Sequence, residues 1–396
     1  MSFQIGNFSL SQNKMVRSKV HWKTAKVSVW LMAIGINLYA VHAAASSSPL
    51  NYESSGSVLL SDQFAPSAHS VSLEGSSLDV ERERLYSIDF ESTITRAAHT
   101  WFMWLEYSRN PSEGGVSSWL GNTNEDAATT EDGRGTSRTQ LSSLYWQYAL
   151  PSSEQQVLLG LAEVSMLVDT NDVANDEVGQ FMTAGFVNNP SIDFPDYAPA
   201  LRYQGVTSDE TWRWRLLLSS AKGLADNQGN YADTFNQING ADGVFATLEG
   251  QRQLAKNTTL TFGSWHNSDT KRHGVYSALY KEIGDIQLHS RLGHSRSYQH
   301  AQDDEALDKT HFASLSGQYT HQAFTLAAGA SFIGNESSGG QTAVTRMVEC
   351  YVKYDWSENL HTTVAAQWHD GAVNSDEPGV VANWQNVMTL RTVLHW

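Results

Sequence analysis

The sequence predicts an all-β fold, a transmembrane antiparallel β-barrel of about 16 strands with a short helical loop that folds inward. Three observations support this prediction. From residue 84 onward, segments of about ten residues alternate apolar and polar side chains with a period of two. Charged residues make up only 17% of the chain and hydrophobic residues 40%, which suits strands with one face in lipid. No run of about 20 apolar residues, the length of a membrane helix, occurs beyond residue 45.

The first 45 residues have the pattern of a signal peptide for export. Five basic residues lie between Lys14 and Lys26, and an apolar stretch follows over residues 27–41. Small residues then offer cleavage near Ala43 or Ala45. The alternative is an uncleaved membrane anchor, which the short apolar stretch disfavours. Export is therefore expected.

The rest of the chain divides into two expected parts. Residues 46–84 are rich in Ser and weakly patterned, so we expect an irregular N-terminal lead-in. The outer-membrane barrel is expected over residues 85–396, with no linker inside it. Trp and Tyr number 13 and 15, as aromatic girdles at the two membrane interfaces require.

The last strand has the clearest alternation. Met388, Leu390 and Trp396 share one face, and Arg391 and His395 share the other. A chain that ends on an aromatic residue after such a strand resembles outer-membrane proteins in general. The alternative, a water-soluble β-sandwich, is disfavoured because several strands carry Trp or Tyr on the outward face.

Connection lengths predict which end of the barrel is which. Short connections at 281–285 and 357–359 are expected on the periplasmic side. Longer polar connections are expected outside the cell, at 109–139, 222–241, 295–309 and 370–384.

One segment, residues 162–199, does not alternate. Asn171 or Asp172 is placed to cap a helix over 173–186, and Pro190 follows soon after it. A long structured loop of this kind either folds into the lumen, the reading we favour, or packs on the barrel rim. The polar residues expected at the resulting constriction are Asp172, Asp176, Glu177, Gln180, Asn188 and Asn189.

This loop also carries a family resemblance. The runs 169–181, 186–190 and 194–195 resemble the carbohydrate-selective porin family (OprB type), as do the strand segments before them at 144–147 and 157–160. Further similar features are Glu349 in its strand and Gln367-Trp368-His369 before a Pro378-Gly379 loop. The resemblance covers residues 75–396.

The resemblance implies a sixteen-stranded porin in the bacterial outer membrane, through which mono- and disaccharides diffuse passively. It implies carbohydrate solutes and outer-membrane lipid as partners, in a homotrimer or a monomer. Charged and polar side chains near the constriction are expected to bind sugar hydroxyls. The chain departs from the family in its net charge of −16, which becomes more negative once the basic signal is removed. This charge favours cations or neutral solutes and argues against nucleic acid as a partner.

Strand alternation itself nominates the residues that face the lumen. Acids and bases facing one another across a pore orient polar solutes without holding them tightly. The nominated pore-lining, substrate-binding residues are Glu91, Glu106, Arg202, Arg213, Arg215, Glu249, Arg291, Glu349, Lys353, Arg391 and Gln367.

Two other functional classes fit the sequence less well than a pore does. A barrel hydrolase needs a catalytic constellation, but no nucleophile elbow or metalloprotease motif stands out, so no catalytic residue is predicted. An adhesion protein that displays loops is disfavoured because the loops are moderate and not repetitive. With one cysteine, Cys350, and scattered histidines, we predict no disulfide, metal or cofactor. A cation-preferring porin without sugar selectivity remains the alternative within the pore class.

Overall fold

A computed structural model describes the chain over residues 48–66, 71–73, 76–78, 82–112, 115–120, 123–126, 129–130, 136–151, 154–224, 231, 243–298, 307–370 and 384–396. The predicted signal peptide, residues 1–45, lies outside these ranges. The helices in the described ranges are all too short or too polar to cross a membrane.

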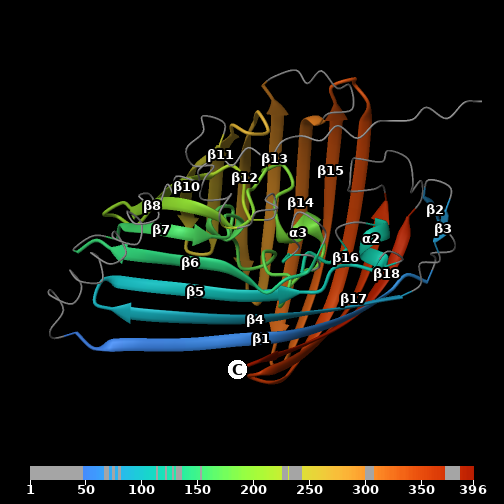
Figure 1. Ribbon diagram of the computed structural model, residues 1–396, viewed down its shortest axis with the longest axis horizontal. Helices are drawn as coiled ribbons and strands as arrows, with labels where there is room; N and C mark the ends of the chain where they lie inside the picture. The colour runs from blue at the N-terminus through green and yellow to red at the C-terminus, as the bar shows by residue number, and fades with distance from the viewer. Residues whose placement is uncertain are drawn as a thin grey trace, which may run out of the picture. The chain divides into compact units, whose positions relative to one another are not determined.

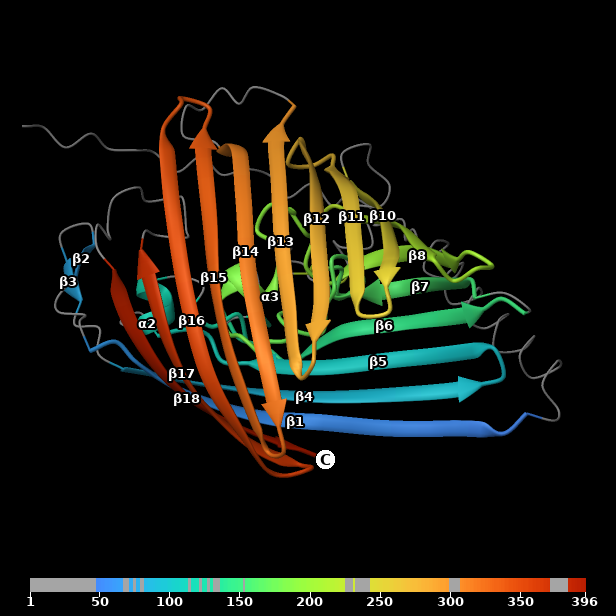
Figure 2. The same cartoon turned by 180° about the vertical axis from the view of Figure 1, so that it is seen from behind.

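Within the described ranges, sixteen strands form one closed antiparallel barrel, as predicted (Figures 1 and 2). The strands are β1 (Leu50–Phe64), β4 (Arg82–Arg96), β5 (His99–Ser108), β6 (Gln140–Ala149), β7 (Gln156–Ala162), β8 (Ala198–Val206), β9 (Trp212–Ser220), β10 (Val244–Ala255), β11 (Thr258–Asn267), β12 (Arg272–Ile283), β13 (Ile286–Ser297), β14 (Leu307–His321), β15 (Phe324–Ser337), β16 (Thr342–Ser357), β17 (Leu360–Asp370) and β18 (Gln385–His395). A separate hairpin joins β2 (Val71–Leu73) to β3 (Ser76–Leu78), and short helices are α2 (Val116–Leu120), η1 (Ser165–Leu167) and α3 (Ala184–Val187).

The barrel closes where β1 pairs with both β4 and β18. Ser57 lies opposite His395 in β18 and opposite Asp89 in β4. Beyond the end of β18, the backbones of Gly56 and Trp396 exchange hydrogen bonds of 3.4 and 3.2 Å. Closure leaves no strand edge in the lipid, where an unpaired edge has no hydrogen-bond partner.

The expectation of an irregular lead-in over residues 46–84 is wrong, because β1 occupies 50–64 and β4 begins at residue 82. In β1 the outward positions include Ser54 and Gly56, where alternation calls for apolar residues. This interruption weakens the period-two pattern that the sequence otherwise shows. The missing apolar bulk has a physical reason at Gly56, since the Trp396 ring fills the space beside it.

Side chains alternate across the barrel wall as predicted. In β18, for example, Leu390 is 51% exposed on the outer face whereas Arg391 is 1% exposed on the inner face. Because a lipid-facing surface must be apolar, the exposed outer side chains form a band of Leu, Val, Ile and Phe around the barrel.

The connections also follow the predicted pattern where the structure describes them. The hairpins between β12 and β13 and between β16 and β17 turn through two residues each, at 284–285 and 358–359. Most of the predicted long connection at 370–384, and part of those at 109–139, 222–241 and 295–309, lies outside the described residues. Which end faces the cell exterior stays a prediction.

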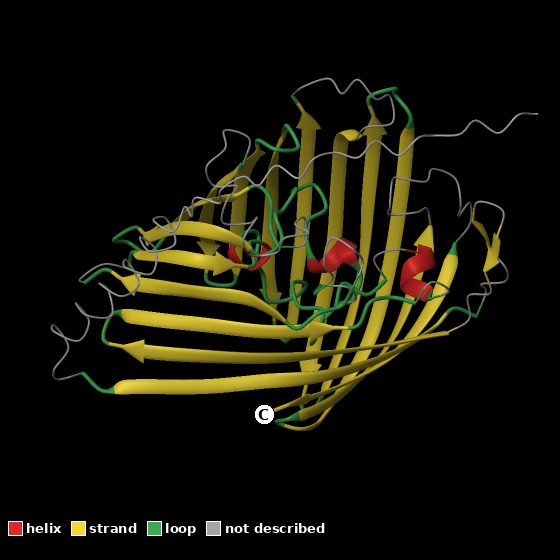
Figure 3. Ribbon diagram, viewed as in Figure 1, coloured by secondary structure: helices red, strands yellow, loops and turns green. Residues whose placement is uncertain are grey.

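The segment between β7 and β8, which we call the inward loop (163–197), folds into the barrel. Figure 3 shows α3 in red among the yellow strands, and α3 contacts β14 and β15. The predicted helix over 173–186 is wrong in extent, because α3 holds only four residues. Instead, the Asn171 side chain accepts hydrogen bonds from the amides of Val173 and Ala174, which turns the chain before a helix can form.

Candidate functional site

The inward loop is held across the lumen by charged side chains of the barrel wall. Glu349 of β16 accepts hydrogen bonds from the amides of Met182 (3.0 Å) and Thr183 (3.1 Å) and from the Thr183 hydroxyl (3.0 Å). These amides precede α3 and have no partner within the loop itself. A buried carboxylate satisfied by three donors fixes this part of the loop firmly.

Arg291 of β13 holds the loop from a second side. Its Nη1 donates to the carbonyl oxygen of Phe186 at 2.7 Å, and its Nη2 donates at 2.8 Å to the carbonyl oxygen of Asp169 and to Oδ1 of Asn175. Nε also lies 3.2 Å from the Asp169 carboxylate. Only arginine presents donors in a planar fork that reaches so many acceptors at once.

Two further wall residues complete the attachment. Arg391 of β18 donates to the carbonyl oxygens of Glu177 and Gln180. Glu249 of β10 accepts from the amide of Asp169 at 2.9 Å and forms an ion pair of 2.8 Å with Arg215. With Glu349 and Arg291, these side chains tie the loop to β10, β13, β16 and β18.

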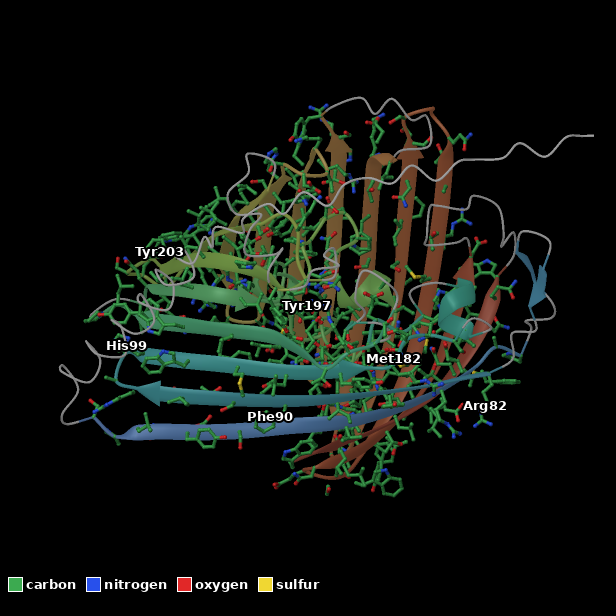
Figure 4. All side chains as sticks on the ribbon, in the orientation of Figure 1. Arg82, Phe90, His99, Met182, Tyr197 and Tyr203 are labelled. Carbon is green, nitrogen blue, oxygen red and sulfur yellow. The ribbon has the colours of Figure 1, made fainter. Side chains whose placement is uncertain are left out.

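Apolar packing fills the space between these polar anchors. Phe181, Met182 and Phe186 pack on the inner faces of β15, β16 and β17 (Figure 4 labels Met182). Gly329 of β15 permits this approach, since a Cβ there would lie 2.6 Å from the Phe186 ring. Each buried large side chain contributes roughly 1.5–3 kcal/mol, so the cluster and the anchors together hold one loop position.

A second connection, the one between β5 and β6, also turns inward. Gln367 of β17 donates to the carbonyl oxygen of Thr123 at 3.1 Å, and the Glu125 amide donates to the carbonyl oxygen of Met182 at 2.9 Å. On β5, Glu106 accepts from the hydroxyl of Tyr197 in the inward loop at 2.9 Å. The two connections therefore support one another inside the barrel.

The structure divides the predicted pore-lining residues into two groups. Six are buried and bonded to the inward loop, to the 109–139 connection or to neighbouring wall residues: Glu106, Glu249, Arg291, Glu349, Arg391 and Gln367. The other five keep exposed or half-buried side chains: Glu91, Arg202, Arg213, Arg215 and Lys353. Of the predicted loop residues, Asp172 and Asp176 are exposed, Glu177, Gln180 and Asn188 are half-buried, and Asn189 is buried.

Sequence reasoning missed part of a row of amides on the inner face of β6, β7 and β8. The Gln147 amide donates to Oε1 of Gln156 at 3.1 Å, and Gln204 donates to the same oxygen at 2.8 Å. Arg202 donates to Oε1 of Gln147 at 3.2 Å. Strand alternation places Gln156 and Gln204 on the inner face, and that position could have identified them from the sequence. The two residues lie directly opposite each other in the strand register.

Aromatic rings lie beside this amide row. Phe102 of β5 and Tyr145 of β6 are half-buried, point inward and stack with centroids 4.9 Å apart. Farther around the barrel, Gln318 of β14 donates to Oε1 of Gln287 of β13 at 2.6 Å. An aromatic face beside amide donors and acceptors suits a neutral solute that has both hydroxyl groups and apolar ring faces.

Buried and half-buried acids in the two inward connections make their packing dependent on pH. Burial raises the pKa of Glu163 to about 8, and the nearby Glu106 carboxylate adds to the shift against a lowering hydrogen bond from Ser165. Burial also raises the pKa of Glu125 and of Asp126 to about 7. The folded state thus favours the protonated acids more strongly than the unfolded chain does.

We therefore expect the barrel to be more stable at pH 5.5 than at pH 8.5. A raised pKa adds stability below the unfolded value and loses it as the pH rises through about 7 to 8. Melting temperatures in detergent at the two pH values measure the difference. A Glu163→Gln variant should reduce the gap, whereas a higher melting temperature at pH 8.5 would contradict this assignment.

No family model matches the chain, and no curated protein sequence matches it. Several solved structures match the chain in fold. OprB of Pseudomonas putida aligns with a TM-score of 0.60 at 11% identity, over 92% of this chain and 97% of that one. The trimer form of Vibrio cholerae OmpT aligns at 0.54 and 11% identity, over 88% and 99%. An anion-selective porin from Comamonas acidovorans aligns at 0.54 and 8% identity, over 88% and 100%. Identities this low carry the fold alone: the chain is a closed sixteen-stranded antiparallel β-barrel with the fold of these porins.

Proposed function

We propose that the barrel is a passive, weakly selective pore for mono- and disaccharides and similar small neutral solutes. The observation that carries this proposal is that the inward-facing residues fall into two groups, one buried and hydrogen-bonded and the other accessible from the lumen. Charged side chains such as Arg291 and Glu349 are buried and hydrogen-bonded to the inward loop. What stays available on the inner face of β5 to β8 is the amide row, with Arg202 beside it, and the Phe102–Tyr145 pair.

This arrangement favours neutral polyhydroxylated solutes over small ions. Amides offer both donors and acceptors, so a sugar hydroxyl can exchange its water partners for wall partners at little net cost. Each such bond is worth only about 1 kcal/mol net, which leaves the solute free to move on. Tight binding would instead block passage.

A cation-preferring pore is the second candidate, and a specific observation favours it. Asp172 and Asp176 are exposed on the inward loop, and the chain carries a net charge of −16. Exposed carboxylates raise the local concentration of cations. Neutral and cationic solutes can pass through the same pore, so the two candidates differ only in which solute enters faster.

We infer a transport role rather than catalysis. The buried acids of the described inner wall all accept hydrogen bonds from the loops or from neighbouring wall residues: Glu83, Glu106, Glu249 and Glu349. A group occupied in this way is not positioned to transfer a proton to a substrate. Lost hydrolysis on substitution of one histidine would instead support a barrel hydrolase.

Swelling of proteoliposomes tests the proposal directly. Glucose, the anion gluconate and the cation glucosamine have similar size, so their relative rates report charge preference. We expect glucose and glucosamine to enter faster than gluconate. Absence of glucose entry, with protein shown to be folded, would contradict the pore, and fastest entry of gluconate would contradict its charge preference.

Ion selectivity should respond to Arg202 and Asp176 in opposite directions. Arg202→Gln removes a cation beside the amide row and should raise the preference for K⁺ over Cl⁻ about twofold. Asp176→Asn removes an exposed acid of the loop and should lower that preference by a similar factor. Reversal potentials in a KCl gradient measure both changes, and two shifts of the same sign would contradict the lumen assignment.

A further inference from the structure

The outer face of the barrel carries basic and imidazole side chains at the loop end of β11 to β14. In the strand register His266 lies opposite His273, His273 lies opposite Arg296, and Arg296 lies opposite Lys309. These four residues form a first row across four strands. In a chain with a net charge of −16, such a concentration of positive groups needs a physical reason.

A second row lies two residues nearer the middle of the strands. His294 of β13 is opposite His311 of β14, and their rings stack with centroids 4.6 Å apart. Tyr298 packs against the first row, with its ring 5.2 Å from His266 and 5.9 Å from His273. The Arg296 Nε lies 3.3 Å from Nε2 of His273. The two rows thus form one continuous surface.

Arg296 and Lys309 are like charges directly opposite one another, an arrangement that destabilises a sheet, so this pair gains from an anionic ligand. Among the described residues, the carboxylates beside the rows are Glu336, 2.7 Å from the Lys309 ammonium, and Asp308, 3.8 Å from it. Both lie at the Lys309 end. Arg296 and the histidines remain on the side away from these acids.

The surroundings of the rows indicate an amphiphile rather than a free anion. Immediately toward the middle of the same strands lie Val275, Leu292 and Leu315, whose side chains are 56%, 59% and 60% exposed on the outer face. A lipid can place acyl chains on these residues while its phosphate reaches the rows. Charge and apolar surface are therefore stacked in the order of a lipid's headgroup and tails.

We propose that the two rows bind the phosphate headgroup of an anionic lipid in the membrane leaflet at the loop end of the barrel. Arg296 and Lys309 supply charge-assisted hydrogen bonds, and the histidines supply further donors beside them. This site lies on the outer face and is independent of what passes through the lumen.

Native mass spectrometry of the folded barrel in detergent tests the proposal, with phosphatidic acid as the probe and phosphatidylcholine of the same acyl chains as reference. Arg296→Gln together with Lys309→Gln should weaken phosphatidic acid binding about tenfold. Arg252→Gln with Lys256→Gln, which removes two exposed positive charges at the turn end, is the matched control and should leave binding unchanged. Arg296→Lys with Lys309→Arg keeps both charges and should retain most of the binding.

Three results would overturn the site. The first is equal phosphatidic acid binding in the parent and the Arg296→Gln/Lys309→Gln variant at equal folded fraction. The second is displacement of the lipid by millimolar inorganic phosphate, which would show a free-anion site. The third concerns Asp303, Asp304 and Glu305, which lie outside the described residues. If the parent bound no phosphatidic acid but a variant with these three acids neutralised did, the acids of the chain itself would occupy the two rows.

Discussion

Replacing Arg291 by Met should free one side of the inward loop and raise the single-channel conductance severalfold. The substitution removes the donors to the carbonyl oxygens of Phe186 and Asp169 and leaves the Asp169 carboxylate without its cation. Breaking a buried ion pair by removing one partner costs about 3–5 kcal/mol. This cost falls on the part of the inward loop around Asp169 and Phe186, so we expect that part to leave the lumen while the barrel stays folded.

Planar-bilayer recordings in phosphatidylcholine measure this effect. Arg296→Met is the matched control, because Arg296 lies on the same strand but on the outer face and is exposed. It should leave conductance unchanged. An Arg291→Met barrel with parental conductance and parental melting temperature would show that Arg291 does not hold the loop.

The second large effect is expected at the closure of the barrel. Gly56→Val should prevent most of the chain from forming a closed barrel, because a Cβ at this position would lie 2.7 Å from the carbonyl oxygen of Asp89 and closer still to the Trp396 ring. The Asp89 contact involves backbone of the paired strand, which cannot move without breaking the β1–β4 register.

The folded fraction after refolding into detergent, read from heat-dependent gel migration, measures this change. Ser54→Val places the same side chain two residues away on the same outward face and should fold normally. Gly56→Val combined with Trp396→Ala should recover part of the folded fraction, because the contacts with the Trp396 ring are then removed and the Asp89 contact stays. Normal folding of Gly56→Val would show that the β1–β18 closure tolerates bulk at this point.

Sequence patterns predicted the barrel wall well because its alternation is a local property. Leu390 and Arg391 face opposite sides of β18 whatever the rest of the chain does, and the structure confirms this. The same rule failed for β1, where Ser54 and Gly56 interrupt the outward apolar positions. Gly56 is small because Trp396 occupies its space, and that contact joins the two ends of the barrel.

The site was predicted only in part for the same reason. Alternation placed Glu349 and Arg291 on the inner face, but their partners are more than 100 residues away in sequence. Nothing local distinguishes a charge that lines water from one that binds a loop. The predicted helix also exceeded α3, since Asn171 and the carbonyl contacts of Arg391 favour turns over a continuous helix.

We propose that the anchored inward loop narrows a wide barrel to the size of small neutral sugars. Proteoliposome swelling with a series of neutral mono-, di- and trisaccharides tests this size limit, with the parent and Arg291→Met compared at equal folded amounts. The parent should admit mono- and disaccharides and slow the trisaccharide strongly, and Arg291→Met should admit all three. No sugar entry by the parent, or the same size limit in both proteins, would contradict the claim.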